Sequence, residues 1–319
     1  MCTAISVNLG RHFFGRTLDI GRSYGERIVI FPRRAELRLL YEPALLEHQA
    51  IIGMAHMNGK TPLYYDGVNE SGVAMAALSF PTITHYNKPR SDMTSLASFE
   101  LIPYVLSRAR TLAEAVELLT VINLTDDSAS PSLPPTPLHF IVADSSGCVV
   151  AEPSDEGLRL FDNAFGVMTN APSFDYHLTR LSEYMTLTPK NPDNNLTREA
   201  RLTPASGGYG AIGLPGDWSS ASRFVRGVFA REHTLKTDDS VLDFFHIIGT
   251  VEVPNGTSQE PDGQPTLSVY TSAIDTAGGI YYYKTYDSFG ISSVRLGGAD
   301  LDGSRAIEHP LSRGVLNEL

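Results

Sequence analysis

The sequence has few cysteines, no excess of basic residues and no long hydrophobic segment. Only 2 of its 319 residues are cysteine, Cys2 and Cys148, too few for a disulfide framework or a thiolate-rich metal site. The 36 acidic residues outnumber the 25 basic ones and give a net charge of −11, which disfavours nucleic acid and anionic membranes as partners. No apolar run approaches the length of about 18 residues that predicts a membrane span, and the N-terminal segment lacks a secretory signal pattern. We therefore expect a cytoplasmic protein that binds neither nucleic acid nor membrane.

Motifs for a metal or an organic cofactor are also missing. The 9 histidines form no H-E-x-x-H pattern, and no C-x-x-C pair occurs. His139, in PLHFIVAD, and His246, in FFHII, are interpreted as hydrogen-bonded core histidines. The glycine-rich GGYG at residues 207–210 lacks the preceding strand and the G-x-G-x-x-G spacing of a dinucleotide site, and it indicates a flexible loop. We expect no metal and no cofactor.

The residues that are present are those of a globular protein with many turns. Hydrophobic residues make up 42% of the chain, and the 27 glycines and 20 prolines supply turn positions. Short segments rich in β-branched and aromatic residues predict strands at the start: CTAISVNL, HFFGRTLDI and RIVIFPRR. LHFIVAD, GCVVAEP and GLRLFDN predict an antiparallel meander in the middle, with a hairpin turn at residues 145–147. TLSVYTSAID, GIYYYKTYD and ISSVRL predict a last group of strands.

Helical segments separate these groups of strands. A helical region, one helix or two in tandem, is predicted over residues 95–119, because Thr111 and Glu114 form a T-x-x-E capping box. Later helices are predicted at YHLTRLSEYM, SASRFVRGVFARE and SVLDFFHIIGTV. Residues 187–219 are rich in Pro, Asn, Gly and Ser and predict a long loop excursion, which is functional or makes subunit contacts. The order of elements indicates one layered α+β domain over residues 1–319 with antiparallel sheets.

Cys2 is the first candidate for chemistry. A small residue after the initiator methionine allows an aminopeptidase to remove Met1, so we expect the mature chain to begin with Cys2. Cys2 would then carry both a thiol and a free α-amine. An α-amine with a reference pKa of about 7.7 to 8.0 can take the proton from the thiol. Nucleophile and base would reside in one residue. Cys148 lies in an apolar strand and is predicted to be a buried structural thiol.

Arg16 and Asp19, in FGRTLDI, are predicted to lie near Cys2, because their strand should pair with the strand that begins there. Arg16 would stabilise a thiolate by its positive charge, and Asp19 would accept a hydrogen bond from the α-amine. Residues three apart in a strand point to opposite faces, so the strand must end or bend near Leu18 if both are to reach the site. The alternative for each residue is a surface ion pair.

Six motifs carry a likeness that runs from residue 1 to about residue 302. They are MCTAISV, FGRTLDI, NESGVAMAALSFP, VMTNAPSFDYH, GLPGDWSSASRFVR and YYYKTYD. In this order they resemble the choloylglycine hydrolases, the family that contains conjugated bile salt hydrolases and penicillin V acylases. The resemblance implies an N-terminal-nucleophile hydrolase fold with four layers, αββα, in which two antiparallel sheets are stacked between helices. It also implies a homotetramer.

The resemblance assigns roles residue by residue. It makes Cys2 the nucleophile and base and places Arg16 and Asp19 beside it. It implies that Asn170, in MTNAP, donates a side-chain N–H to the oxyanion, and that Arg223, in SRFVR, supports the charged transition state. Without the family, Asn170 would be interpreted as a turn residue and Arg223 as an exposed helix residue.

One position departs from the family pattern. Ser79, in ALSFP, stands where bile salt hydrolases usually have Asn and penicillin V acylases often have Tyr. The role implied for this position includes a backbone N–H for the oxyanion, which every residue except proline retains. Ser79 and Phe80 are therefore expected at the substrate-binding and oxyanion position, with catalysis kept and substrate preference open.

Three functional hypotheses follow from these residues. The leading one is hydrolysis of the amide bond in glycine- or taurine-conjugated bile salts by Cys2. The second keeps the mechanism and changes the acyl group, to that of penicillin V or of an N-acyl homoserine lactone. The third, of another class, is a non-catalytic protein that binds amphiphiles. The intact set of candidate residues argues against the third, since a binding protein needs no processed N-terminal thiol.

Overall fold

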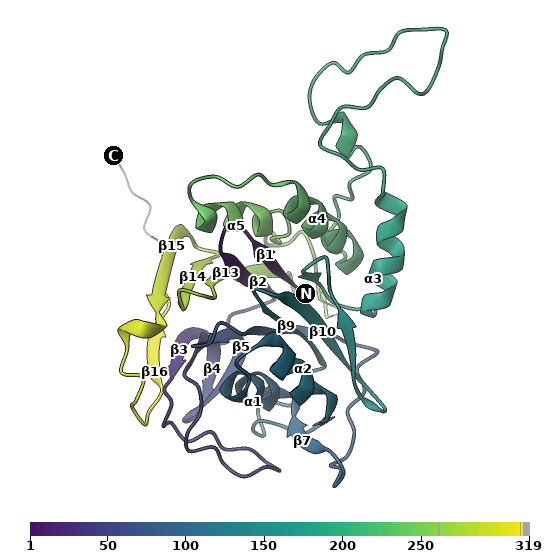
Figure 1. The fold of residues 1–319 in the computed structure, drawn as a ribbon. Helices are drawn as coiled ribbons and strands as arrows, with labels where there is room; N and C mark the ends of the chain where they lie inside the picture. The colour runs from purple at the N-terminus through teal and green to yellow at the C-terminus, as the bar shows by residue number, and fades with distance from the viewer. Residues whose placement is uncertain (261, 313, 315–319) are drawn as a thin grey trace.

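Two antiparallel sheets are stacked in the structure, a computed structural model that describes residues 1–260, 262–312 and 314 (Figure 1). The strands of the first sheet are β1 (Cys2–Asn8), β2 (His12–Ile20), β12 (Val167–Met168), β13 (Leu267–Asp275), β14 (Ile280–Thr285) and β15 (Ser288–Arg295). Those of the second are β3 (Arg27–Phe31), β4 (Ile51–Asn58), β5 (Thr61–Asn69), β6 (Ala74–Ser79), β9 (Leu138–Asp144), β10 (Gly147–Ser154), β11 (Gly157–Asp162) and β16 (Ile307–Pro310). Their spatial orders are β12-β1-β2-β13-β14-β15 and β11-β10-β9-β6-β5-β4-β3-β16.

Helices cover the outer face of each sheet. The helices are α1 (Leu101–Arg108), α2 (Leu112–Thr120), α3 (Phe174–Leu181), α4 (Ser220–His233) and α5 (Ser240–Gly249). Helices α1 and α2 pack on β5, β6, β9 and β10 of the second sheet, whereas α4 and α5 pack on β1, β2, β12 and β13 of the first (Figure 1). The layers run helix, sheet, sheet, helix, so the predicted α+β class and αββα architecture are confirmed.

Local sequence signals account for several of these elements. The Thr111 side chain accepts a hydrogen bond from the backbone N–H of Glu114 and caps α2, as the capping box predicts. The hairpin turn after Asp144 joins β9 to β10. Cys148 is buried, and its burial raises the pKa of the thiol to about 12, which fits the predicted structural role.

The predicted helical start at residue 95 is wrong. Residues 94–97 form β7 (Thr94–Ala97), which pairs in parallel with β8 (Ile122–Thr125) beyond the end of α2. The pairing is non-local, so a capping box and a helical pattern further along the chain give no sign of it. The rest of the region is two helices, because the chain is extended at Ala109 between α1 and α2.

The predicted excursion projects from the body of the molecule between α3 and α4 (Figure 1). Its one short helical turn is a 3-10 helix at Tyr209–Ala211. Apolar side chains are largely exposed along it and just before it, with exposed fractions of 86% at Leu196, 74% at Ile212 and 81% at Met185, two residues before its start. In the part of the chain that the structure describes, no helix combines the length and apolar character needed to cross a bilayer.

His12, on β2, makes the fold sensitive to acid. It is 4% exposed, and its ring nitrogens each lie 2.9 Å from a hydroxyl, of Ser6 and of Thr276. Burial lowers its pKa from 6.5 to about 4, so the unfolded chain binds a proton there at a higher pH than the folded chain. The stability conferred by neutral His12 is fully present above pH 6.5 and is lost as the pH falls toward about 4. The loss amounts to about 3 kcal/mol at about 1.36 kcal/mol for each pH unit.

We therefore expect the change His12→Gln to reduce the acid-induced loss of unfolding free energy between pH 7 and pH 4.5. Urea unfolding at the two pH values measures it. His85→Gln, at an exposed position, is the matched control and should leave the acid-induced loss as it is in the unaltered chain. An equal loss in the unaltered chain and in the His12→Gln variant would contradict the assignment.

Candidate active site

A cavity of about 730 Å³ lies at the start of β1 and contains the Cys2 side chain in its wall. The first sheet contributes Cys2, Arg16 and Leu18, and the second contributes Tyr65 and others. Further lining residues come from the loop before β9 and from the loop before β13: Ala129, Ser132, Leu133, Pro134, Pro135, Thr136, Glu260, Asp262 and Gln264. The cavity is therefore formed where the two sheets meet two loops, with apolar and polar groups in its wall.

Cys2 is fixed by the ladder between β1 and β2. It is 2% exposed and pairs with Leu18, while Ala4 pairs with Arg16. Side chains alternate along a strand, so those of Cys2, Arg16 and Leu18 point to the same face, toward the cavity. The backbone N–H of Cys2 donates to Asn170 Oδ1 at 2.8 Å. Met1, which precedes it, also lines the cavity and donates its terminal amine to the carbonyl oxygen of Asp19 at 2.6 Å.

Arg16 is fully buried and bridges the two sheets. Its Nη1 donates to the carbonyl oxygen of Ala77 at 2.5 Å and to that of Tyr65 at 3.1 Å, both in or next to the second sheet. Its Nη2 has no hydrogen-bond partner among the described residues. Burial alone lowers the pKa of the guanidinium, but the negative groups around it, with Cys2 foremost, raise the pKa above its ordinary value. Arg16 thus stays charged beside the thiol.

A buried carboxylate that the sequence analysis did not identify lies near Arg16. Asp66 is fully buried and accepts hydrogen bonds from the hydroxyls of Tyr270 at 2.7 Å and Tyr281 at 2.5 Å. Burial raises the pKa of Asp66, while Arg16 and the two hydroxyls act in the opposite direction. The sequence offered a weak signal, an aspartate within the apolar segment YYDGVN. Its two tyrosine partners lie 204 and 215 residues away, which no local pattern reveals.

Asp19 lies on the opposite face of β2 from Arg16. It accepts hydrogen bonds from the hydroxyls of Thr17 at 2.9 Å and Ser268 at 2.6 Å. Burial raises the pKa of this carboxyl, and the positive charge of Arg223 opposes the rise. The strand does not end at Leu18 but continues to Ile20, and the register shift beside Leu18 and Asp19 falls on the neighbouring β13. Arg16 and Asp19 therefore approach the start of β1 from two faces of one sheet.

Asn170 and Arg223 lie beside the backbone of Cys2. Arg223 is fully buried; it donates from Nη1 to the Cys2 carbonyl oxygen at 2.5 Å and from Nη2 to Asn170 Oδ1 at 2.7 Å. Asn170 Nδ2 donates to the Ser79 carbonyl oxygen at 2.7 Å. Two donors on one side of the amide and a carbonyl on the other fix its orientation. The second N–H of the amide group makes no hydrogen bond to the described residues.

The next arginine along the helix, Arg226, has a different surrounding. Its guanidinium donates to the carbonyl oxygens of Pro215 at 2.8 Å, Asp217 at 2.6 Å and Thr250 at 3.1 Å. It joins the end of the excursion to the end of α5 and does not line the cavity among the residues described there.

Ser79 and Phe80 are placed differently. Ser79 lines the cavity, and its carbonyl group faces Asn170. Within a strand, the N–H and the carbonyl group of one residue point to the same side. The Ser79 N–H therefore faces the site as well. The Phe80 N–H donates to the Pro137 carbonyl oxygen at 2.8 Å and is not available to an oxyanion. The Phe80 ring is buried and stacks on His139, outside the residues described as lining the cavity. In the described ranges no group of three or more His, Cys, Asp or Glu side chains could hold a metal ion.

Two stacked antiparallel sheets between helices, with the buried Cys2 thiol at the first residue of a central strand, define the N-terminal-nucleophile hydrolase class. The sequence model of the linear amide C–N hydrolases, choloylglycine hydrolase family, matches residues 2–309. The chain belongs to this family, and it is a hydrolase of amide C–N bonds.

Similar proteins agree over the full length. The chain is 40% identical over 314 residues to a bile salt hydrolase/transferase of Lactiplantibacillus plantarum, covering 98% of this chain and 97% of the relative. It is 33% identical to one of Clostridium perfringens, with 95% of each chain covered. The crystal structure of a C2A mutant of the conjugated bile acid hydrolase from Clostridium perfringens superposes with a TM-score of 0.93 at 31% identity, covering 100% of both chains. Penicillin V acylase from Agrobacterium tumefaciens shares the fold, with a TM-score of 0.76 at 20% identity over 98% of this chain and 92% of the other.

Proposed function

We propose that the protein hydrolyses the amide bond between a bile acid and glycine or taurine, with Cys2 as nucleophile after removal of Met1. The observation that carries the proposal is the convergence of Arg16, Asn170 and Arg223 on Cys2, which itself lies in the wall of one cavity together with Arg16. The volume of about 730 Å³ lies within the range of about 300–1,000 Å³ that binds small molecules, and its mixed lining suits an amphipathic substrate. The names of the full-length relatives support a conjugated bile salt as the substrate.

The reaction begins when the α-amine of Cys2 takes the thiol proton and the sulfur attacks the amide carbon. The carbonyl oxygen becomes an oxyanion, which accepts hydrogen bonds from the Ser79 backbone N–H and from the free N–H of Asn170. Collapse breaks the C–N bond, and the α-ammonium returns its proton to the leaving glycine or taurine nitrogen. Water then gives a proton to the amine and attacks the thioester, which releases the bile acid and restores the thiol.

Charged groups on both faces of β1 and β2 support these steps. Arg16 places a positive charge on the thiol face and stabilises the thiolate. Asp19 lies on the other face, where its carboxylate orients the α-ammonium once Met1 is removed. Arg223 holds Asn170 Oδ1 and the Cys2 carbonyl in one arrangement, so that the nucleophile and the oxyanion donor keep a fixed relation.

We also propose that the protein is a homotetramer assembled through the excursion. Exposed apolar side chains at Leu196 and Ile212 within it, and at Met185 just before it, support this assignment. A second, apolar cavity of about 370 Å³ lies between α3, α4 and the start of the excursion, where a second copy could cover it.

Side-by-side assays with taurocholate, glycocholate and penicillin V test the proposed substrate. Released taurine or glycine is measured by ninhydrin or mass spectrometry. We expect turnover of at least one conjugated bile salt to exceed that of penicillin V. Preference for penicillin V would contradict the proposed substrate while leaving the amide hydrolase class intact.

Ser79 offers a test of substrate selection. We expect Ser79→Asn to change the ratio of bile salt to penicillin V hydrolysis more than it changes the maximum rate on the better substrate. A side chain in the cavity wall acts through fit, where a change the size of a methylene shifts discrimination by about 1 to 3 kcal/mol. The backbone N–H, which serves every substrate, is unchanged.

Ser79→Pro is the control, because it deletes this N–H and should depress all substrates together. Loss of an oxyanion donor typically costs about 100- to 1,000-fold in kcat. Circular dichroism checks that the variant folds, since Ser79 ends β6. Equal losses on all substrates in Ser79→Asn, or no change on any, would show that position 79 does not set selectivity.

A further inference from the structure

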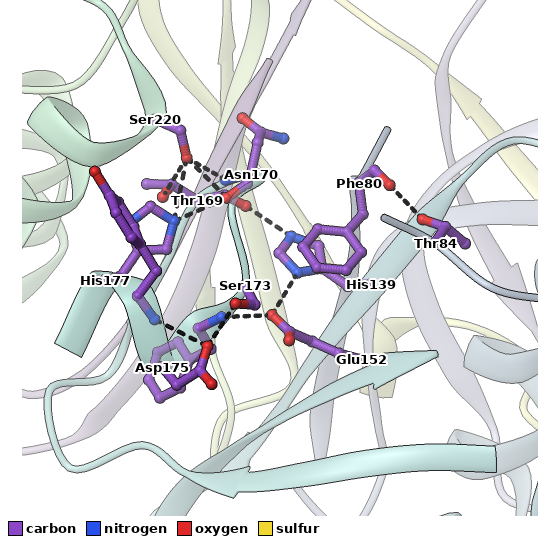
Figure 2. Close-up of polar contacts among 12 residues, drawn as sticks. Phe80, Thr84, His139, Glu152, Thr169, Asn170, Ser173, Asp175, His177 and Ser220 are labelled. Carbon is purple, nitrogen blue, oxygen red and sulfur yellow. Dashed lines mark hydrogen bonds and ion pairs between the residues drawn. The ribbon is translucent and has the colours of Figure 1, made fainter. Parts of the chain in front are cut away.

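The backbone around Asn170 is held by side chains rather than by a strand partner. Asn170 follows the two-residue strand β12, whose pairing with β1 ends at Met168. Beyond that point the polar groups of the backbone bond to side chains from three other elements (Figure 2). His139 on β9 donates from Nε2 to the Thr169 carbonyl oxygen at 2.8 Å, and His177 on α3 donates from Nε2 to the Asn170 carbonyl oxygen at 2.9 Å.

Ser220, the first residue of α4, completes the set. Its hydroxyl oxygen accepts the Asn170 backbone N–H at 2.9 Å and lies 2.8 Å from the Asn170 carbonyl oxygen. The carbonyl groups of Thr169 and Asn170 and the N–H of Asn170 are thus bonded to buried or half-buried side chains. The position of the Asn170 Cα is set from β9, α3 and α4 at once.

Each histidine is itself held in one orientation. A carbonyl oxygen only accepts, so both rings must carry the proton on Nε2. Burial lowers the pKa of His177, which favours the neutral ring with that single proton. The His139 ring stacks on Phe80 with 4.2 Å between centroids, and the His177 ring stacks on Phe224 with 5.0 Å between centroids.

Glu152, on β10, holds the start of α3 and lies beside His139. Its Oε1 lies 3.5 Å from His139 Nδ1 and accepts the backbone N–H of Phe174, the first residue of α3, at 2.8 Å. The start of the helix that carries His177 is therefore bonded to Glu152, next to His139 (Figure 2). His139, Glu152 and His177 are all at most 6% exposed, and none lines the cavity among the residues described there.

We propose that His139 and His177 are positioning residues that hold the Asn170 backbone so that its free amide N–H meets the oxyanion. The inference rests on the proposed role of Asn170. The Asn170 side chain is already committed to Cys2, Arg223 and Ser79, so a shift of its backbone would misplace the one remaining N–H. A misplacement of about 1 Å in a catalytic group can cost about 100-fold in rate. Removing either histidine donor should therefore lower kcat and leave KM nearly unchanged.

Paired substitutions test this at each histidine. His139→Leu and His177→Leu delete the donor, whereas His139→Gln and His177→Gln keep an amide N–H near the place of Nε2. We expect the leucine variants to lose about 10- to 100-fold in kcat, less than the roughly 100- to 1,000-fold loss known for deleting an oxyanion donor itself, and the glutamine variants to recover most of it. Rates are divided by the number of Cys2 thiols that iodoacetamide titrates, so a misfolded fraction does not count. The alkylation rate itself should not change.

Ser220→Ala is a smaller perturbation at the same backbone, because it deletes one hydroxyl at the start of α4. It should also lower kcat per titrated thiol, and Ser220→Thr should retain it. If both leucine variants and Ser220→Ala keep the kcat of the unaltered chain, the inference is overturned. It is equally overturned if the glutamine variants are as impaired as the leucine variants.

Asn170→Ala separates this inference from the proposed function. If it leaves kcat unchanged, both the role of Asn170 and the inference fail. If it lowers kcat but the histidine variants do not, only the inference fails. When it does lower kcat, adding His177→Leu to Asn170→Ala should cause no further loss, because His177 acts through Asn170. A full additional loss in the double variant would contradict the inference.

Discussion

Cys2→Ser is expected to lower turnover by several orders of magnitude while leaving the fold intact. A hydroxyl has a pKa far above that of a thiol and is a poor match for an α-amine that must take its proton. The substitution changes one atom at a position that is 2% exposed, so the unfolding free energy should fall by no more than about 3 kcal/mol. Initial rates on taurocholate and glycocholate, with urea unfolding of both proteins, measure the two effects.

The comparison requires that both proteins begin at residue 2. Serine is also small enough for removal of Met1, and the intact mass of each protein shows whether the methionine is gone. A processed Cys2→Ser variant with near-normal turnover would rule out the thiol as nucleophile. Cys148→Ser is the matched control at the other cysteine and should keep full activity, because that thiol lies buried in β10.

Blocking the α-amine of Cys2 is expected to abolish hydrolysis. In the chain that retains Met1, the Cys2 nitrogen is a peptide nitrogen that donates to Asn170 Oδ1, and its lone pair is delocalised into the carbonyl group and cannot accept the thiol proton. Met1 also occupies part of the cavity wall and bonds to the Asp19 carbonyl oxygen. Placing a lysine between Met1 and the cysteine prevents removal of the methionine and creates this blocked state. Activity on conjugated bile salts measures the outcome, and intact mass verifies the blocked terminus.

The matched control carries, in place of the lysine, a recognition site for a protease that leaves the cysteine as the new first residue. Cleavage should restore activity to the level of the unaltered protein. The blocked protein should still react with iodoacetamide, which would show that the thiol is present and that the amine is what it lacks. Full activity in a chain with a verified blocked terminus would contradict the role of the amine.

Signals that act over a few residues predicted the local elements well. The capping of α2 by Thr111 and the turn between β9 and β10 depend on neighbours in the chain and are present as expected. Strand β7 was not predicted because its partner β8 lies beyond two helices in the sequence. Asp66 was not predicted because its tyrosine partners lie at the other end of the sequence. Pairing between distant segments is decided by the whole fold, which a single sequence displays poorly.

The candidate site was predicted from the family resemblance far more than from spacing. The expected bend in β2 followed from a correct rule about alternation and a mistaken premise, that Arg16 and Asp19 must reach the site from one face. Phe80 was placed at the oxyanion position by its neighbour in the motif, yet its N–H belongs to Pro137. The role of a backbone group depends on which side of the strand it faces, and that alternates with every residue.

We expect position 223 to tolerate almost no substitution. The Arg223 guanidinium meets four acceptors: the carbonyl oxygens of Trp218 and Cys2, Thr3 Oγ1 and Asn170 Oδ1. These four acceptors surround the planar guanidinium, which has five N–H donors. A lysine has three donors on a single nitrogen and cannot reach all four acceptors. Neighbouring positions can differ between relatives as long as the Arg223 guanidinium keeps its four acceptors. If Arg223 has the role that we propose, a relative that differs at this position should keep the fold and lack the hydrolase activity.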